Sequence, residues 1–340
     1  MLRPQFYVTA KCNLSCPYCS VRGCLPEGDM PADVFKNLVR RCASLGAQYV
    51  EITGGEPFVR DDLLSILGSI NGVLPAQVLT NGTLITRDQA RTLAQLDVAI
   101  QVSLDGASKE VNRPLRGEGS FEAALGGIRL LQDSGVREIS IAVTIQRTNA
   151  DDVENIIALA ERERVDLVTF RPVVPPSDPT SFASPLDANG ILKLSRRVYS
   201  YRGPVKATLV LYGFGRDALS GERWCVPGRS PCIVPDGSVF PCQGFAECFD
   251  VDKEIPRVSL EDQISSEAII GLRQSCSGRA ERIEECSICP WKHFCQGGCP
   301  ALAYREHRTF TAKDSFCEAR KRLYEDLFLY EDEHGTGNLE

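Results

Sequence analysis

Three cysteines near the start of the chain have the type and spacing of a metal site. Cys12, Cys16 and Cys19 are separated by three and two residues and follow a short strand-like segment. Three thiolates from one loop can hold three irons of a [4Fe-4S] cluster and leave the fourth iron open to an exchangeable cofactor. A zinc site is the alternative, but zinc usually takes four ligands in paired spacings, and Cys24 is the only nearby cysteine to complete one. The spacing therefore favours an iron-sulfur cluster.

A glycine motif follows the next strand-like segment. Residues 49–53 read as a buried strand, and Gly54, Gly55, Glu56 and Pro57 come directly after it. Two glycines let the backbone approach a ligand closely, and the Glu56 carboxylate or freed backbone groups can meet an ammonium group. The motif is therefore a candidate contact for a ligand that carries an amino group.

Together, in this order and separation, the two motifs resemble the radical S-adenosylmethionine superfamily. The loop of that family carries this cysteine spacing with an aromatic residue, here Tyr18, before the last cysteine. The resemblance implies that Cys12, Cys16 and Cys19 hold a [4Fe-4S] cluster that binds S-adenosylmethionine. It also implies that Gly54, Gly55 and Glu56 contact the methionine amino group of the cofactor.

The same resemblance assigns further cofactor contacts. It implies that Ser103, in a Ser-Leu-Asp-Gly turn, and Arg116 contact the ribose and the carboxylate of the cofactor. Tyr18 and Arg171 are also expected to contact the cofactor. The family commonly has an aspartate a few residues before the arginine, and this chain has Asn112 there. Without the resemblance, Ser103 reads as a strand-end hydroxyl and Arg116 as a solvated loop charge.

Bulk composition excludes several classes of protein. The chain has 340 residues, a net charge of -7 and 15 cysteines. No Lys/Arg stripe indicates nucleic-acid binding, no apolar run reaches the roughly 18 residues of a membrane span, and the N-terminus lacks signal-peptide features. In a reducing cytosol, so many cysteines are more often metal ligands or reactive thiols than disulfides. We therefore expect a cytoplasmic protein with no membrane or nucleic-acid partner.

Apolar periodicity predicts an α/β fold. Strand-like segments at 5–10, 49–53, 76–80, 98–104, 138–145 and 166–172 alternate with helical patterns at 31–45, 61–70, 86–96, 121–132, 151–163 and 187–201. Thr86 with Gln89, and Ser120, are the expected helix caps. Six strand-helix units need roughly 190 residues, which favours a partial (β/α)6 TIM barrel over an open doubly wound sheet. In either fold the polar motifs, including Arg171, collect at the carboxyl ends of the strands.

A second cysteine field begins at residue 224. Residues 235–238 predict a hairpin turn, and seven cysteines surround it or follow it: Cys225, Cys242, Cys286, Cys289, Cys295, Cys299 and Cys317. Read alone, they could bind two zincs or two iron-sulfur clusters. Their order resembles the SPASM extension of radical S-adenosylmethionine enzymes, which has two auxiliary [4Fe-4S] clusters. The resemblance implies that Cys225, Cys242 and Cys299 hold the first, with Cys232 as a candidate fourth ligand, and that the other four hold the second.

These patterns predict four regions: a barrel at 1–205, a bridging region at 206–223, the SPASM domain at 224–320, and a C-terminal helix and tail at 321–340. Four cysteines remain outside the predicted ligand sets. Cys42 fits a buried position in a helix, while Cys24 and Cys276 have no assigned role. Cys248 lies six residues after Cys242, where the family has its substrate cavity. It is therefore a candidate catalytic thiol.

The resemblance implies that the enzyme forms a 5'-deoxyadenosyl radical, which takes hydrogen from an unactivated C–H bond. Dehydrogenation needs a base, but the aspartate that sulfatase-maturing members have directly after the second cysteine is replaced by Gln243, which cannot accept the proton. Epimerisation needs a hydrogen donor, for which Cys248 is the candidate. Peptide crosslinking often uses a leader-binding domain, and about ten residues precede the cluster loop. A zinc or iron-sulfur binding protein would leave the first two motifs without a purpose.

The narrower resemblance is to radical enzymes that tailor aminoglycosides, neomycin C epimerase among them. It makes a sugar epimerase the leading expectation, with an aminosugar-containing small molecule as substrate, and peptide modification the second. Acidic side chains suited to a polyamine sugar are Asp105, Glu118 and Glu247. The expected electron donor is a flavodoxin or ferredoxin.

Overall fold

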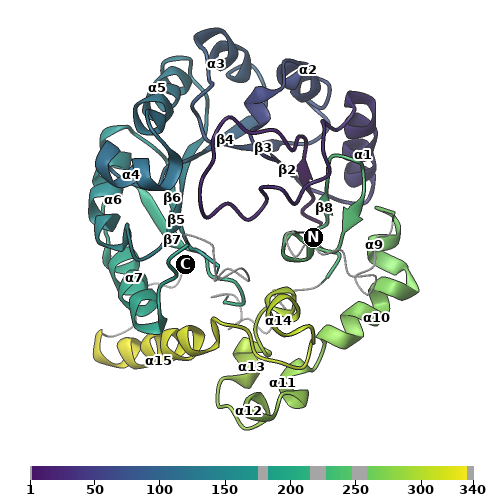
Figure 1. The fold of residues 1–340 in the computed structure, drawn as a ribbon, viewed down its shortest axis with the longest axis vertical. Coiled ribbons are helices and arrows are strands. Elements are labelled where there is room, and N and C mark those ends of the chain that lie inside the picture. The colour runs from purple at the N-terminus through teal and green to yellow at the C-terminus, as the bar shows by residue number, and fades with distance from the viewer. Residues whose placement is uncertain (1, 175–182, 215–226, 247–258, 335–340) are drawn as a thin grey trace.

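A computed structural model describes residues 2–174, 183–214, 227–246 and 259–334. At its centre, six parallel strands pair in chain order and curve into a partial barrel (Figure 1). They are β1 (Gln5–Tyr7), β2 (Val50–Thr53), β3 (Ala76–Thr80), β4 (Val98–Ser103), β5 (Ile139–Ile145) and β6 (Leu167–Pro172). The predicted fold class is confirmed.

Helices cover the outside of the curved sheet (Figure 1). They are α1 (Ala32–Ser44), α2 (Leu63–Gly68), α3 (Arg87–Leu93), α4 (Lys109–Arg116), α5 (Ser120–Asp133), α6 (Val153–Arg162) and α7 (Ala188–Ser200), with short 3-10 turns η1 (Pro57–Val59) and η2 (Ala150–Asp152). The Thr86 cap is confirmed, because Thr86 and Gln89 form a reciprocal capping box. The Ser120 cap is wrong: Gly119 occupies the cap position at a φ of 70°, and Ser120 is the first residue of α5. Sequence reasoning also missed α4.

The two faces of the sheet differ in polarity. Residues such as Ile52, Val78 and Ile141 are fully buried in the core between the strands and the helices. The alternate residues face the inside of the barrel and are largely polar: Gln5, Glu51, Gln77, Gln101, Ser140, Thr169 and Arg171. Because side chains alternate along a strand, one sheet carries both an apolar outer face and a polar inner face.

The sheet continues beyond the six predicted strands. Strand β7 (Lys206–Leu209) pairs with β6, whereas sequence reasoning placed these residues in the bridging region. At the opposite edge, β8 (Cys232–Ile233) pairs in parallel with β1 and forms an antiparallel hairpin with β9 (Val239–Phe240). Gly237 turns this hairpin at a φ of 83°, which agrees with the predicted turn. The cysteine-rich segment is therefore joined to the barrel edge by backbone pairing.

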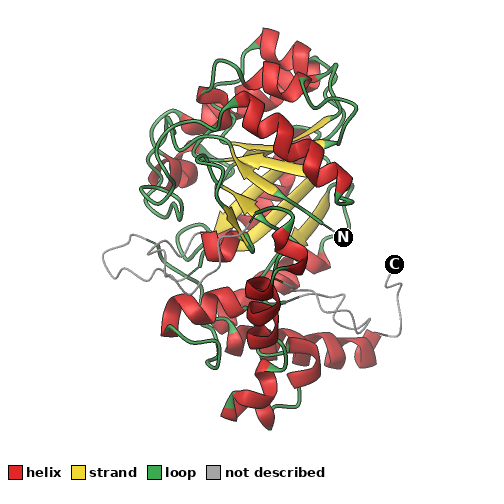
Figure 2. Ribbon diagram, turned by 90° about the vertical axis from the view of Figure 1, so that its right-hand side faces the viewer, coloured by secondary structure: helices red, strands yellow, loops and turns green. Residues whose placement is uncertain are grey.

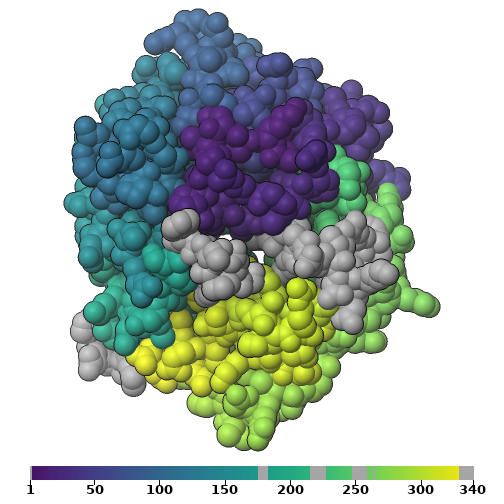
Figure 3. Space-filling view, in the orientation of Figure 1, coloured from purple at the N-terminus to yellow at the C-terminus, as the bar shows by residue number. Residues whose placement is uncertain are grey.

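A helical lobe lies below the barrel (Figure 2). Its elements are α8 (Gln243–Ala246), α9 (Asp262–Ser265), α10 (Glu267–Cys276), α11 (Arg279–Arg282), α12 (Glu284–Ser287), α13 (Lys292–Cys295), α14 (Pro300–His307) and α15 (Cys317–His334). Helix α15 returns to the barrel and packs on α7, where Arg196 Nη2 lies 2.6 Å from Asp326 Oδ1. Figure 3 shows that the N-terminal residues lie over the barrel on this face and that the C-terminal residues lie below them. Among the described residues, no helix has the length and apolarity to cross a membrane.

Candidate functional site

The three-cysteine loop lies across the end of the barrel where the parallel strands terminate (Figure 1). The pKa of Cys16 is raised to about 11, chiefly by burial and also by the charges of Asp105, Cys19 and Cys12, while Arg116 acts in the opposite direction. The three thiols are thus close enough to influence one another. Three thiols gathered beside a cation fit a cluster that binds thiolates, because each lost proton is replaced by a bond to iron.

Asp105 anchors this loop to the sheet. The carboxylate is fully buried just after β4, and it accepts hydrogen bonds from the Tyr18 hydroxyl and from Thr144 N at 2.8 Å. Arg116 Nε lies 2.8 Å from Asp105 Oδ2, and the guanidinium carbon is 5.9 Å from the centre of the Tyr18 ring. Asn112 completes the arrangement by accepting a hydrogen bond from Asp105 N at 2.9 Å. Sequence reasoning placed Asp105 in a strand-end turn but missed this role.

Arg116 and Tyr18, which were predicted to contact the cofactor, therefore both contact Asp105 beside the three-cysteine loop. Burial alone would lower the pKa of Arg116, but Asp105 and Tyr18 raise it above its ordinary value. The guanidinium stays charged, which suits attraction of a carboxylate. Ser103 is half-buried at the end of β4, on the same strand end as Asp105. Their contacts with S-adenosylmethionine remain predictions.

The two glycines of the Gly54–Pro57 motif pack against the base of the cysteine loop. A Cβ on Gly54 would lie 2.3 Å from Thr9 O, and one on Gly55 would lie 2.2 Å from Lys11 O. Gly55 N donates to Thr9 O at 2.9 Å, and Glu56 N donates to Lys11 O at 2.8 Å. The glycines therefore also serve the fold, because only residues without a side chain permit this backbone approach.

Glu56 connects the motif to the next strand end. Its buried carboxylate accepts hydrogen bonds from Phe58 N at 3.0 Å, Thr80 Oγ1 at 2.7 Å and Asn81 N at 2.6 Å. Burial raises the pKa of Glu56, and these three donors oppose the shift. The predicted contact with the cofactor's amino group would have to share this carboxylate with them or use the adjacent backbone.

Asn13 links the cysteine loop to the same strand end. Asn81 Nδ2 donates to Asn13 Oδ1 at 2.9 Å, and Asn13 Nδ2 donates to Thr83 Oγ1 at 2.9 Å. Hydrogen bonds therefore run from Glu56 through Asn81 to the cysteine loop. Sequence reasoning missed Asn13, although its place directly after the first cysteine was a usable signal.

The inside of the barrel carries opposite charges. Arg171 is exposed at the end of β6, and its charge reaches Glu51 of β2. Burial raises the pKa of Glu51, whereas Arg171 and a hydrogen bond from Gln5 Nε2 at 3.0 Å lower it. Gln5 is buried, and its Oε1 has no hydrogen-bond partner among the residues of the four described ranges. A polar ligand inside the barrel would therefore meet an acceptor, a carboxylate and a guanidinium.

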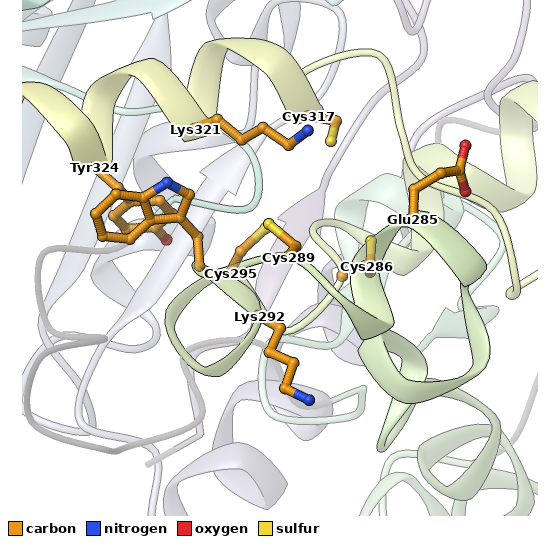
Figure 4. A pocket seen from close by; sticks show the side chains of 10 residues that line it. Glu285, Cys286, Cys289, Lys292, Cys295, Cys317, Lys321 and Tyr324 are labelled. Carbon is orange, nitrogen blue, oxygen red and sulfur yellow. The ribbon is translucent and has the colours of Figure 1, made fainter.

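Four predicted ligands of the second auxiliary cluster surround one pocket in the lobe (Figure 4). Cys286 comes from α12, Cys289 from the turn after it, Cys295 from the end of α13 and Cys317 from the start of α15. The pKa of Cys286 is raised to about 11, chiefly by burial and also by the other three thiols. The residues that the resemblance grouped together are thus brought together in space, and four thiols fit a four-iron cluster.

The predicted ligands of the first auxiliary cluster are only partly described. Cys299 is buried, and Cys242 packs against the same group of apolar residues. Burial raises the pKa of Cys299 to about 12, with Asp314 and Cys242 acting in the same direction. Cys276, which had no predicted role, also packs there and is influenced by Cys299.

The remaining predicted site cysteines are Cys232, Cys225 and Cys248. Cys232 is buried in β8 among Tyr7, Leu25 and Phe240. Cys225 and Cys248 lie outside the described residues. The ligation by Cys225 and Cys232 and the catalytic role of Cys248 remain predictions. In the described ranges, no three His, Cys, Asp or Glu side chains form a group that could hold a single metal ion.

Comparison with known proteins places these features in a family. Residues 6–160 match the model described as the Radical SAM superfamily. Mycofactocin maturase MftC of Mycolicibacterium smegmatis is 30% identical over 317 residues, which cover 87% of this chain and 77% of the relative.

Solved structures share the fold. SuiB of Streptococcus suis bound to S-adenosylmethionine has a TM-score of 0.78 at 17% identity and covers 93% of this chain and 77% of its own. The structure of anSMEcpe with bound AdoMet and a Cp18Cys peptide has a TM-score of 0.76 at 18% identity and covers 98% of both chains. The similarity extends through the cysteine-rich lobe.

Proposed function

Because this chain belongs to the radical S-adenosylmethionine superfamily, we propose that it modifies a C–H bond of a hydrophilic substrate bound inside the barrel. The family binds a [4Fe-4S] cluster and S-adenosylmethionine, and its SPASM members carry auxiliary clusters. When bound, this pair supplies a 5'-deoxyadenosyl radical. Thiol-only ligand sets suit a reducing compartment, so we expect the reaction in the cytoplasm.

The polar inner face of the sheet is the observation that carries the choice of a hydrophilic substrate. Glu51, Gln5 and Arg171 offer opposite charges and a spare acceptor on the inside of the barrel. A buried polar group costs free energy unless it is hydrogen-bonded, so this face favours a ligand with many donors and acceptors. Both peptides and aminosugars meet that requirement.

Peptide maturation is the first candidate. It is supported by 30% identity to a mycofactocin maturase and by a fold shared with anSMEcpe, whose solved structure holds a peptide. Loss of a hydrogen atom to the radical, a proton to solvent and an electron to an auxiliary cluster would leave a product two hydrogens lighter. The order of the two candidates reverses that of the sequence analysis, because the relatives favour a maturase.

Sugar epimerisation is the second candidate. It rests on the position of Cys248, six residues after Cys242, and on Gln243 in place of a proton-accepting aspartate. In this reaction the Cys248 thiol would return a hydrogen atom to the opposite face of the carbon, so the product keeps its mass, and the thiyl radical left behind would be restored by an electron from an auxiliary cluster and a proton from solvent. An aminosugar-containing natural product is the substrate class. A flavodoxin or ferredoxin is the proposed electron donor for either reaction.

Turnover in D2O distinguishes the two. Reconstituted, reduced enzyme is incubated with S-adenosylmethionine and either a panel of synthetic peptides or the aminoglycoside neomycin C. A peptide product two hydrogens lighter supports maturation. A neomycin epimer with one solvent-derived deuterium supports epimerisation.

The Cys248→Ala variant is the matched control. For an epimerase it still cleaves the cofactor but loses the epimer, whereas for a maturase that does not use this thiol it retains product formation. Cofactor cleavage that neither class of substrate stimulates contradicts the proposed substrate classes.

A further inference from the structure

A buried arginine that donates to no carboxylate within the described ranges lies beside the segment that joins the two auxiliary cysteine groups. Arg279, the first residue of α11, is 1% exposed. Its guanidinium donates to four backbone carbonyls, at Phe310 (2.7 Å), Gly297 (2.8 Å), Gly298 (3.0 Å) and Ala312 (2.7 Å). Carbonyl dipoles satisfy the donors, but they leave a full positive charge in a low-dielectric environment.

Two of these carbonyls belong to the segment that joins the cysteine groups. Gly297 and Gly298 lie between Cys295, a predicted ligand of the second cluster, and Cys299, a predicted ligand of the first. Both glycines have positive φ, 84° and 76°, which favours glycine. Arg279 therefore holds the one short segment that serves both sites.

A second buried arginine holds the same segment from the other side. A Cβ on Gly298 would lie 2.1 Å from Arg320 Nη2, so the glycine makes room for the guanidinium. Arg320 Nη2 donates to Asp314 Oδ1 at 2.7 Å, and Cys299 N donates to Asp314 Oδ2 at 2.7 Å. Arg320 is thus hydrogen-bonded to Asp314, whereas Arg279 donates to carbonyls and interacts with the Asp314 charge only at longer range.

The charge of Arg279 reaches cysteines of both groups. Gly298, whose carbonyl accepts a hydrogen bond from Arg279 at 3.0 Å, directly precedes Cys299 of the first group, and Ala280, the residue after Arg279, packs with Ile283 and Cys286 of the second group. Cys276 packs beside Cys299, whereas Cys286 lines the pocket of the second group. A cluster with thiolate ligands is negatively charged and gains one more negative charge on reduction, when no bond forms or breaks.

We propose that Arg279 is a shared positioning residue whose charge raises the reduction potentials of both auxiliary clusters. Net charge and hydrogen bonding near the sulfurs are among the factors that set the potential of an iron-sulfur cluster. A positive charge between the clusters stabilises the state in which either has accepted an electron. This inference needs the auxiliary clusters but is independent of the proposed substrate.

The test removes the first cluster and titrates the other two. In full-length protein carrying Cys12→Ala, Cys16→Ala and Cys19→Ala, dithionite titration followed by electron paramagnetic resonance reports the auxiliary clusters alone. Arg279→Gln keeps hydrogen-bond donors but removes the charge. We expect the equilibrium constant for reduction of both clusters to fall about tenfold, which corresponds to about 59 mV for a one-electron couple. Arg279→Lys keeps the charge, so its reduction potentials are expected to stay closer to those of the parent protein.

Arg282→Gln is the matched control, because Arg282 lies in the same short helix but is exposed. Water and salt screen its charge, so we expect the equilibrium constant for reduction of either cluster to change by less than about twofold. Unchanged potentials in Arg279→Gln at full iron content overturn the proposal, as do equal shifts in the Gln and Lys variants. If Arg279→Gln loses iron, retention of iron in Arg279→Lys supports a role for the charge. Loss of iron in both variants overturns the proposal. The proposal is also overturned if the parent protein holds no auxiliary clusters, whichever substrate the enzyme uses.

Discussion

Arg116 and Asp105 form a buried ion pair directly beneath the three-cysteine loop. Arg116 Nε and Asp105 Oδ2 are 2.8 Å apart, and the side chains are 10% and 0% exposed. The same carboxylate accepts a hydrogen bond from Tyr18, the residue before the last cysteine of the loop. One carboxylate at the end of β4 thus fixes both the loop and the cation beside it.

Asp105→Asn should therefore destabilise the protein and loosen the cysteine loop. Removing one partner of a buried ion pair leaves an uncompensated charge, which typically costs about 3–5 kcal/mol. We expect a loss of about 3 kcal/mol in the free energy of unfolding, measured by urea denaturation. The control is Glu118→Gln, which breaks the exposed pair with Arg113 at 3.5 Å and should change stability by no more than about 0.5 kcal/mol. Equal effects of the two substitutions would contradict the anchoring role.

Gly55→Ala tests the contact between the glycine motif and the cysteine loop. The added Cβ would lie 2.2 Å from Lys11 O, so the loop has to move. We expect iron content to fall from about twelve to about eight per chain, because only the first of three four-iron clusters is affected. Gly68→Ala, at the end of α2 with no atom within 4 Å of the added Cβ, should keep all the iron. Full iron content in Gly55→Ala would rule out this dependence.

Removal of iron should unfold the helical lobe before the barrel. The helices α11, α12 and α13 are four residues each, too short to be stable alone, and the cysteines around them come from separate segments. After chelation, we expect amide hydrogens of 279–295 to exchange much faster while those of β2 to β5 stay protected. Hydrogen exchange read by mass spectrometry measures both regions in one sample. Uniform protection after iron loss would show that packing alone holds the lobe.

Much of the barrel could be predicted because its strands are short apolar runs between amphipathic helices. Ala76–Thr80 was predicted to the residue, since Pro75 and Asn81 bound it. The resemblance to SPASM enzymes grouped Cys286, Cys289, Cys295 and Cys317, and all four line one pocket, while their ligation of a cluster remains a prediction. The hydrogen bonds of Asp105 and the positions of Arg279 and Arg320 depend on contacts between distant segments, which no local pattern encodes. Strand β7 was missed because it is only four residues long and begins with an exposed lysine, so that only pairing with β6 makes it a strand.

Reductive cleavage of S-adenosylmethionine tests the central claim most directly. Purified protein is reconstituted with iron and sulfide without oxygen, reduced with dithionite and mixed with S-adenosylmethionine, and 5'-deoxyadenosine and methionine are quantified by liquid chromatography. We predict both products in equal amounts from the wild-type chain and neither from Cys16→Ala. A fully loaded, reduced wild-type protein that leaves S-adenosylmethionine intact would contradict the account.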